Sequence, residues 1–138
     1  MAQKHVTAPG TLFLDSEGIS KAAVGDVGVR AFLQAAERRG ARVVVSALSL
    51  TETLGGGPRD AKVRRVIKAV DVVPVTEESA KEAGRLLGTV ATRNDATVDA
   101  NIAVAAMVQP RPLMLLTSDP VDMTALTAAH PHIVITHI

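Results

Sequence analysis

Two short apolar runs that each end beside an aspartate place the strongest constraint on how this chain can fold. The first run covers residues 12–15 and ends at Asp15, and the second covers residues 113–117 and is followed closely by Asp119. Short apolar runs bounded by turn residues are typical of buried strands. If the two strands are parallel, their carboxyl ends lie at the same edge of the sheet, which is where open α/β sheets bind ligands.

Further predicted strands and helices alternate along the chain. Apolar, β-branched segments predict strands at residues 43–45, 72–75 and 132–137, and Pro74 favours an edge position for the second of these. Apolar residues at helical spacing predict helices at residues 25–40, 48–54, 59–70, 77–90, 98–108 and 119–129, whereas residues 19–24 are compatible with a helical turn. We therefore expect an α/β fold with a central, mostly parallel sheet of four to five strands flanked by helices.

Length and composition exclude several classes of protein. The chain has 138 residues, which suits a single domain over residues 1–138 with a loose N-terminal lead-in at residues 1–10. A formal net charge of +1 excludes a highly basic nucleic-acid coat, and an aromatic content of 1% argues against RNA binding by base stacking. The absence of cysteine excludes disulfides, thiolate metal sites and a Cys nucleophile. There is no signal-peptide core and no apolar run of membrane-spanning length, so we expect a cytoplasmic protein without a membrane partner.

Acidic residues beside apolar segments are the candidate functional groups, and each has an ordinary explanation when it is taken alone. Glu52 can be a solvated helix residue, and Asp99 can be an acid favoured by the helix dipole. Asp119 can cap the helix that Pro120 starts. Carboxylates that converge without Lys or Arg partners would repel one another, and Mg²⁺ or Mn²⁺ would relieve that repulsion and activate water.

Four segments carry a resemblance to a known family. They are Leu-Phe-Leu-Asp-Ser at residues 12–16, Ser-Leu-Thr-Glu at 49–52, Val-Asp-Ala-Asn-Ile-Ala at 98–103 and Leu-Thr-Ser-Asp-Pro-Val-Asp at 116–122. In this order they resemble the four acidic motifs of PIN-domain ribonucleases. The chain length and the order of the motifs resemble the VapC toxins of bacterial type II toxin–antitoxin modules.

The resemblance implies a Mg²⁺- or Mn²⁺-dependent endoribonuclease whose catalytic acids are Asp15, Glu52, Asp99 and Asp119. It implies that Asp15 and Asp99 contact the metal most directly, that Asp119 joins them as a metal ligand, and that Glu52 completes the site directly or through water. The supporting positions that it assigns are Ser16, Ser118 and Asp122, for which turn chemistry or solvation remains an equal explanation. It also implies an RNA substrate, a VapB-like antitoxin as partner and a homodimer.

Some features depart from the family pattern or have two explanations. Asn101 stands where relatives more often carry an apolar residue, and residues 17–26 are rich in glycine and polar side chains. Arg93 could contact an RNA phosphate or be an ordinary loop arginine. The cations of the helix at 59–70 could form a solvated face or a strip that contacts RNA phosphates.

Three other functions remain open on the sequence alone. One is a PIN-domain nuclease that processes RNA without an antitoxin, and another is a catalytically inactive domain that binds through its acidic site. A receiver-like signalling domain needs adjacent acids after the first strand and a Lys after the last strands. Ser16 follows Asp15, and no Lys follows Lys81, so the sequence disfavours a receiver domain.

Overall fold

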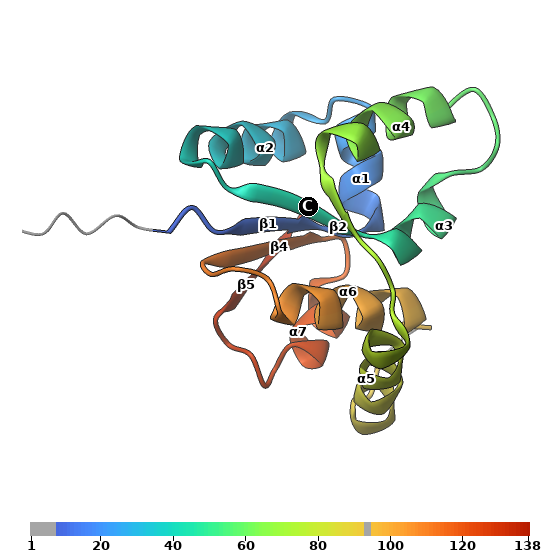
Figure 1. The fold of residues 1–138 in the computed structure, drawn as a ribbon, viewed down its shortest axis with the longest axis vertical. Coiled ribbons are helices and arrows are strands. Elements are labelled where there is room, and N and C mark those ends of the chain that lie inside the picture. Colours follow the sequence, from blue (N-terminus) through green and yellow to red (C-terminus); the bar gives the residue numbers. More distant parts are fainter. Residues whose placement is uncertain (1–7, 93–94) are drawn as a thin grey trace, which may run out of the picture.

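The computed structural model describes residues 8–92 and 95–138, and its centre is a parallel five-stranded sheet (Figure 1). The strand order is β3-β2-β1-β4-β5, so the two strands that precede the aspartates are central neighbours. The strands are β1 (Thr11–Leu14), β2 (Arg42–Ser46), β3 (Asp71–Val73), β4 (Leu113–Thr117) and β5 (Ile133–His137). Every neighbouring pair is parallel.

Helices cover both faces of the sheet. They are α1 (Ser16–Ala23), α2 (Val27–Arg39), α3 (Leu50–Thr53), α4 (Asp60–Ala69), α5 (Glu77–Thr89), α6 (Thr97–Met107) and α7 (Pro120–Leu126), with a 3₁₀ turn, η1, at Ala47–Ser49. In Figure 1, α1, α2 and α4 lie above the sheet, and α5, α6 and α7 lie below it. None of the helices in the described ranges has the length and apolar character needed to cross a membrane.

The central strands are apolar along their whole length because both of their faces are covered. In β1, Leu12 and Leu14 pack into a cluster with residues of α1, α2 and α4, whereas Phe13 packs on the other face with residues of α5, α6 and α7. Strands that alternate between two apolar layers appear in the sequence as continuous apolar runs. The two clusters pack against opposite faces of the sheet, so the central strands are covered on both sides.

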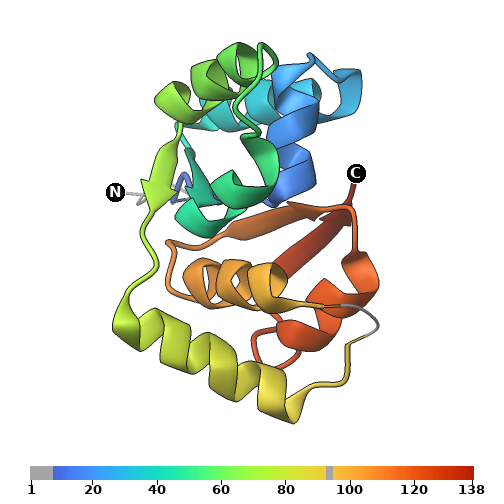
Figure 2. The same ribbon diagram turned by 90° about the vertical axis from the view of Figure 1, so that its right-hand side faces the viewer.

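The strand register aligns the ends of β1, β2 and β4. Leu14 pairs with Val45 in β2 and with Leu116 in β4. The residues that follow these three positions therefore emerge side by side at the carboxyl edge of the sheet. Figure 2 shows this edge facing the viewer, with α3 and the first turn of α6 next to it.

The expected α/β fold with a mostly parallel sheet of four to five strands is confirmed, since the sheet has five strands and every neighbouring pair is parallel. Some boundaries differ. The first strand ends at Leu14, because Asp15 has already left the strand and caps α1. Residues 19–24 are largely the second half of α1, an eight-residue helix that buries Ile19. The strand β3 is an edge strand, as Pro74 predicted, although Pro74 itself lies just after the end of the strand. The last helix ends at Leu126, where Thr127 takes the C-cap position, and not at residue 129. Most of the predicted N-terminal lead-in, residues 1–7, lies outside the described residues.

Candidate active site

Asp15 links the ends of β1 and β4. Its side chain is 4% exposed, and it is the N-cap of α1. One carboxylate oxygen, Oδ1, accepts a hydrogen bond of 2.7 Å from the Gly18 backbone N–H, and Oδ2 accepts one of 2.9 Å from the Ser118 backbone N–H. Burial raises the pKa of Asp15, and these two hydrogen bonds counteract part of that shift. The carboxylate is therefore held in one orientation by two separate segments.

Glu52 reaches the same edge from the short helix α3. Ser46, the last residue of β2, accepts a hydrogen bond from the Leu48 backbone N–H through its side chain, which starts the 3₁₀ turn that leads into α3. Glu52 Oε1 accepts a hydrogen bond of 2.6 Å from the Ser16 hydroxyl. Glu52 is exposed, as a solvated residue would be, but this contact also ties it to the residue that follows Asp15.

Asp119 follows β4 and caps α7. Its Oδ1 accepts a hydrogen bond of 3.2 Å from the Asp122 backbone N–H, and its own N–H donates one of 3.0 Å to the Thr117 hydroxyl. The capping role that the sequence allowed is thus confirmed, together with Pro120 in the first turn. Capping uses Oδ1 and does not exclude a second role for the side chain. Asp122, in the same helix, is 2% exposed.

Asp99 faces the other acids from the first turn of α6. Burial is the largest cause that raises its pKa, from an ordinary 3.8 to about 6. The negative charges of Asp15, Asp119, Glu52 and Asp122 raise it further, in that order. The convergence that the sequence predicted therefore has a physical consequence, because ionisation of Asp99 is opposed by four neighbouring carboxylates.

A cavity of about 390 Å³ brings the predicted residues together. Its lining consists of Asp15, Ser16, Glu17, Ser20, Glu52, Asp99, Ser118 and Asp119. We call it the acidic pocket. All four predicted acids and both predicted serines line it, whereas Asp122 does not. Arg93 lies outside the described residues.

Two lining residues, Glu17 and Ser20, were not singled out from the sequence. Glu17 lies two residues after Asp15 in the first turn of α1, and Ser20 follows one turn later on the same helix. The signal that could have identified them is the capping position of Asp15. An N-cap at that position requires a helix from residue 16 onward and directs the start of that helix to the carboxyl edge.

The donor set of the acidic pocket fits a hard divalent cation. Among the described residues, its lining offers carboxylate and hydroxyl oxygens and no Lys or Arg. In the same part of the chain, no three His or carboxylate side chains are arranged to hold a metal ion directly. Mg²⁺ is often held by only one or two carboxylates and keeps several of its waters. The oxygen chemistry therefore suits Mg²⁺ or Mn²⁺, while the assignment of Asp15, Asp99 and Asp119 as ligands stays a prediction.

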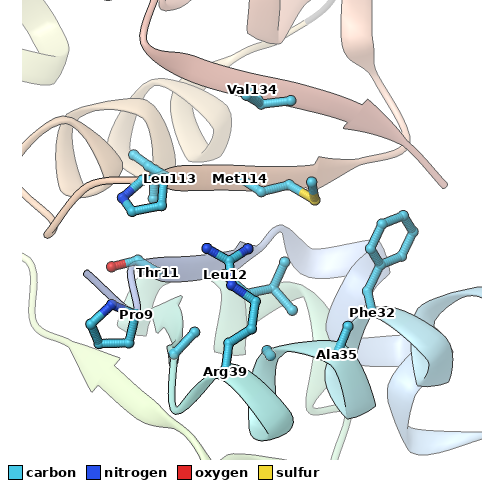
Figure 3. A pocket seen from close by; sticks show the side chains of 12 residues that line it. Pro9, Thr11, Leu12, Phe32, Ala35, Arg39, Leu113, Met114 and Val134 are labelled. Carbon is cyan, nitrogen blue, oxygen red and sulfur yellow. The ribbon is translucent and has the colours of Figure 1, made fainter. Parts of the chain in front are cut away.

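A different cavity, of about 240 Å³, lies at the opposite end of the central strands (Figure 3). Thr11 and Leu113, the first residues of β1 and β4, line it together with Phe32 and Met114. Of the described residues that line this cavity, Arg39 is charged and none is a carboxylate. This cavity lacks the groups that metal binding or acid–base chemistry requires, so the carboxyl edge is the candidate active site.

Comparison with solved structures identifies the fold. VapBC2 from Rickettsia felis, bound to a DNA fragment from its promoter, matches with a TM-score of 0.62 and 10% sequence identity over 93% of this chain and 98% of that chain. FitAB bound to an IR36 DNA fragment matches with a TM-score of 0.62 and 17% identity over 91% of this chain and 94% of that chain. Both are PIN-domain toxin–antitoxin complexes. The chain has the PIN-domain fold.

At these identities the similarity concerns the fold. No family model matches the sequence, and no curated protein sequence is similar enough to count as a relative. The function of this PIN fold must therefore be argued from its own residues. Those residues are the carboxylates of the acidic pocket: Asp15 and Asp119 follow β1 and β4, and Glu52 and Asp99 reach the pocket from α3 and α6.

Proposed function

We propose that this protein is a metal-dependent endoribonuclease and the toxin of a type II toxin–antitoxin module. The observation that carries the proposal is the convergence of Asp15, Glu52, Asp99 and Asp119 on one pocket of a PIN-domain fold. Among the described residues, the lining of the pocket has no Lys or Arg to balance the negative charge of its carboxylates. The raised pKa of Asp99 is consistent with this excess of negative charge, which a bound cation would neutralise. The reaction is hydrolysis of an RNA phosphodiester.

The chain's own residues would position the reacting groups. Asp15 and Asp99 would hold the cation most directly, with Asp119 as a third ligand and Glu52 acting directly or through water. When bound, Mg²⁺ or Mn²⁺ would neutralise developing charge on the phosphate and activate the attacking water. The backbone N–H groups of Gly18 and Ser118 keep the Asp15 carboxylate oriented, and the Ser16 hydroxyl does the same for Glu52.

The electrostatics of the pocket also explain why a cation would be needed before the phosphate to be cleaved can enter it. A phosphodiester is anionic, and the four carboxylates would repel it. A bound divalent cation reverses the sign of the local field at the point where the phosphate must approach. If water attacks the phosphorus atom and the P–O3′ bond breaks, the leaving 3′ oxygen takes up a proton, and the products are a 3′-hydroxyl and a 5′-phosphate.

The toxin part of the proposal is supported by the two solved structures with the same fold, which are toxin–antitoxin complexes. We propose a VapB-like antitoxin as partner and a homodimer as the active form. Induction of the wild-type chain should arrest bacterial growth, and co-expression of the antitoxin should relieve the arrest. Active nuclease that causes no arrest, and whose gene has no neighbouring antitoxin reading frame, would favour an RNA-processing enzyme instead.

Cleavage of total bacterial RNA by antitoxin-free protein tests the nuclease directly. The reaction is run with Mg²⁺, with Mn²⁺ and with EDTA, using wild type and Asp99→Asn. The matched control is Glu77→Gln, which neutralises an exposed acid on α5 outside the acidic pocket. Discrete fragments that need metal, persist in the control and disappear in Asp99→Asn support the proposal. No cleavage by folded wild type with either metal would contradict it.

A further inference from the structure

A second cavity adjoins the acidic pocket on the side of α1 and α4. It has a volume of about 600 Å³ and is lined by Ser20, Ala23, Val24, Thr53, Pro58, Arg59, Lys62 and Val63. We call it the α1–α4 pocket. Ser20 lines both cavities, and Thr53 directly follows Glu52 in α3. Figure 2 shows α4 above α3 and close to α1, on the side of the molecule that carries the acidic edge.

The two adjoining cavities carry opposite charge. Among the residues that the structure describes, the acidic pocket is lined by carboxylates and by no Lys or Arg. The α1–α4 pocket is lined by Arg59 and Lys62 and by no carboxylate. Both cations are exposed, and neither belongs to an ion pair among the described residues. The carboxylate of the adjacent Asp60 is occupied, because it accepts hydrogen bonds from the backbone N–H groups of Gly55 and Gly56. Arg59 and Lys62 are therefore available to an anionic ligand.

The remaining walls of the α1–α4 pocket are largely apolar. Ala23, Pro58 and Val63 contribute to the lining, and Val24 is 72% exposed at its edge. Accessible apolar surface beside two cations suits a ligand that alternates anionic groups with flat, weakly polar rings. A single-stranded nucleic acid has this chemistry, since phosphates recur along its backbone and bases lie between them.

We propose that the α1–α4 pocket holds the stretch of single-stranded RNA next to the cleaved bond, with Arg59 and Lys62 in contact with its phosphates. This inference rests on the proposed nuclease function and assigns the path of its substrate. Without a bound metal ion the acidic pocket repels phosphates, so the affinity of the metal-free protein for RNA must come from Lys and Arg side chains within reach of the pocket. An acidic segment of a partner protein could use the same groups, and the test separates that occupant from RNA.

The test uses RNA binding in the absence of cleavage. A fluorescent single-stranded RNA of mixed sequence is titrated with the full chain in EDTA at several salt concentrations. The variant is Arg59→Ala/Lys62→Ala. The control is Arg65→Ala/Lys68→Ala, which removes the same charge from exposed positions on the same helix but outside the α1–α4 pocket. Arg65 instead lines a cavity between α2 and α4.

Loss of two phosphate contacts should reduce the slope of log affinity against log salt by about 1.4, from about 0.7 for each single-strand contact. We expect this loss in Arg59→Ala/Lys62→Ala and little change in the control. With metal present, the same variant should raise KM for RNA and leave kcat close to that of wild type. Arg59→Lys/Lys62→Arg, which keeps both charges, should bind RNA as wild type does, and thermal unfolding of each variant verifies its fold.

Several outcomes would overturn the inference. If both double variants reduced the slope of log RNA affinity against log salt equally, RNA would contact the cations of α4 in general and not those of the α1–α4 pocket in particular. Unchanged RNA binding in Arg59→Ala/Lys62→Ala, with lost binding to an antitoxin, would assign the pocket to a protein segment. These outcomes are distinct from failure of the proposed function, which is diagnosed by wild-type protein that does not cleave RNA with any metal.

Discussion

The carboxylate of Asp15 accepts a hydrogen bond of 2.9 Å from the backbone N–H of Ser118, which lies 103 residues further along the chain. The other oxygen of the same carboxylate caps α1 through Gly18. One side chain therefore joins the end of β1, the start of α1 and the turn after β4. Because Asp119 is the next residue in that turn, the spacing between two of the candidate catalytic acids depends on this contact.

Replacing Asp15 should affect stability and activity to different degrees. Asp15→Ala leaves two backbone N–H groups without their acceptor, and we expect the free energy of unfolding to fall by about 1–3 kcal/mol. Asp15→Asn keeps one acceptor oxygen and removes a buried charge whose pKa is raised, so it should be less destabilising. Both variants should lose RNA cleavage. Urea unfolding and the cleavage assay together check this, and an Asp15→Ala variant as stable as wild type would contradict the capping role.

Much of the fold follows from the sequence because its strongest patterns are local. The runs at β1 and β4 are apolar on both faces, so they could be placed as central strands without knowledge of their partners. Pro74 has a fixed φ and no backbone N–H, and the structure has an edge strand next to it. Gly40 adopts a left-handed conformation, with φ of 71°, and ends α2. The helix α1 was harder to predict. Its sequence contains Gly18, and the cap from Asp15 and the packing of Ile19 in the core stabilise the helix.

The candidate site was only partly predictable, because the distinction between functional and ordinary acids lies in tertiary contacts. Glu52 looks like a solvated helix residue in the sequence, and its hydrogen bond to Ser16 becomes visible only when α3 and α1 lie together. Asp122 looks like an exposed first-turn acid, but the structure buries it. The motif order predicted which residues would meet, whereas their hydrogen bonds could not be derived from spacing along the chain.

The stability of the metal-free protein should depend on pH through Asp99. Its pKa is about 6 in the folded chain and near 3.8 when unperturbed, so the folded state holds this proton more tightly. Stability contributed by the protonated group is fully present below the unperturbed pKa and is lost as the pH rises through about 6. The Asp99→Asn variant has no group that ionises at this position, so its stability does not fall in this way as the pH rises. With allowance for solvent screening, we expect its free energy of unfolding near pH 7.5 to exceed that of wild type by about 1–2 kcal/mol.

The measurement for Asp99 is chemical denaturation in EDTA at a series of pH values. The advantage of Asp99→Asn should shrink toward zero as the pH falls well below the unperturbed value of 3.8, where the wild-type group is protonated in both the folded and the unfolded state. Glu77→Gln is the control, because it changes an exposed acid outside the acidic pocket. A stability difference that stays constant across the whole pH range would show that ionisation of Asp99 is not its cause.

Divalent cations should stabilise the folded chain through the acidic pocket. Binding to the folded state alone raises the free energy of unfolding by about 2.7 kcal/mol when the metal concentration is about 100 times its dissociation constant. Mg²⁺ and Mn²⁺ should therefore raise the melting temperature of wild type and of Glu77→Gln, and should do so much less in Asp99→Asn. Differential scanning calorimetry with and without EDTA measures this effect. An equal metal-induced shift in all three proteins would place the cation elsewhere.

The turn between α3 and α4 should connect stability to the geometry of both adjoining cavities. The carboxylate of Asp60 accepts hydrogen bonds of 3.0 Å from the Gly55 N–H and 2.8 Å from the Gly56 N–H, and these bonds lower its pKa. A lowered pKa means that the stabilisation is present above the unperturbed value near 3.8 and is lost as the pH falls through the lower folded value.

Asp60→Asn should therefore lower the melting temperature near pH 7, and the deficit should diminish in strong acid as the wild-type carboxyl also becomes protonated. Because the turn lies between α3, which carries Glu52, and α4, which carries Lys62, we expect the variant also to raise KM for RNA. Asp71→Asn is a control, since its side chain forms an exposed ion pair with Arg42 outside both cavities. If both variants changed KM equally, the turn would have no special part in placing the substrate.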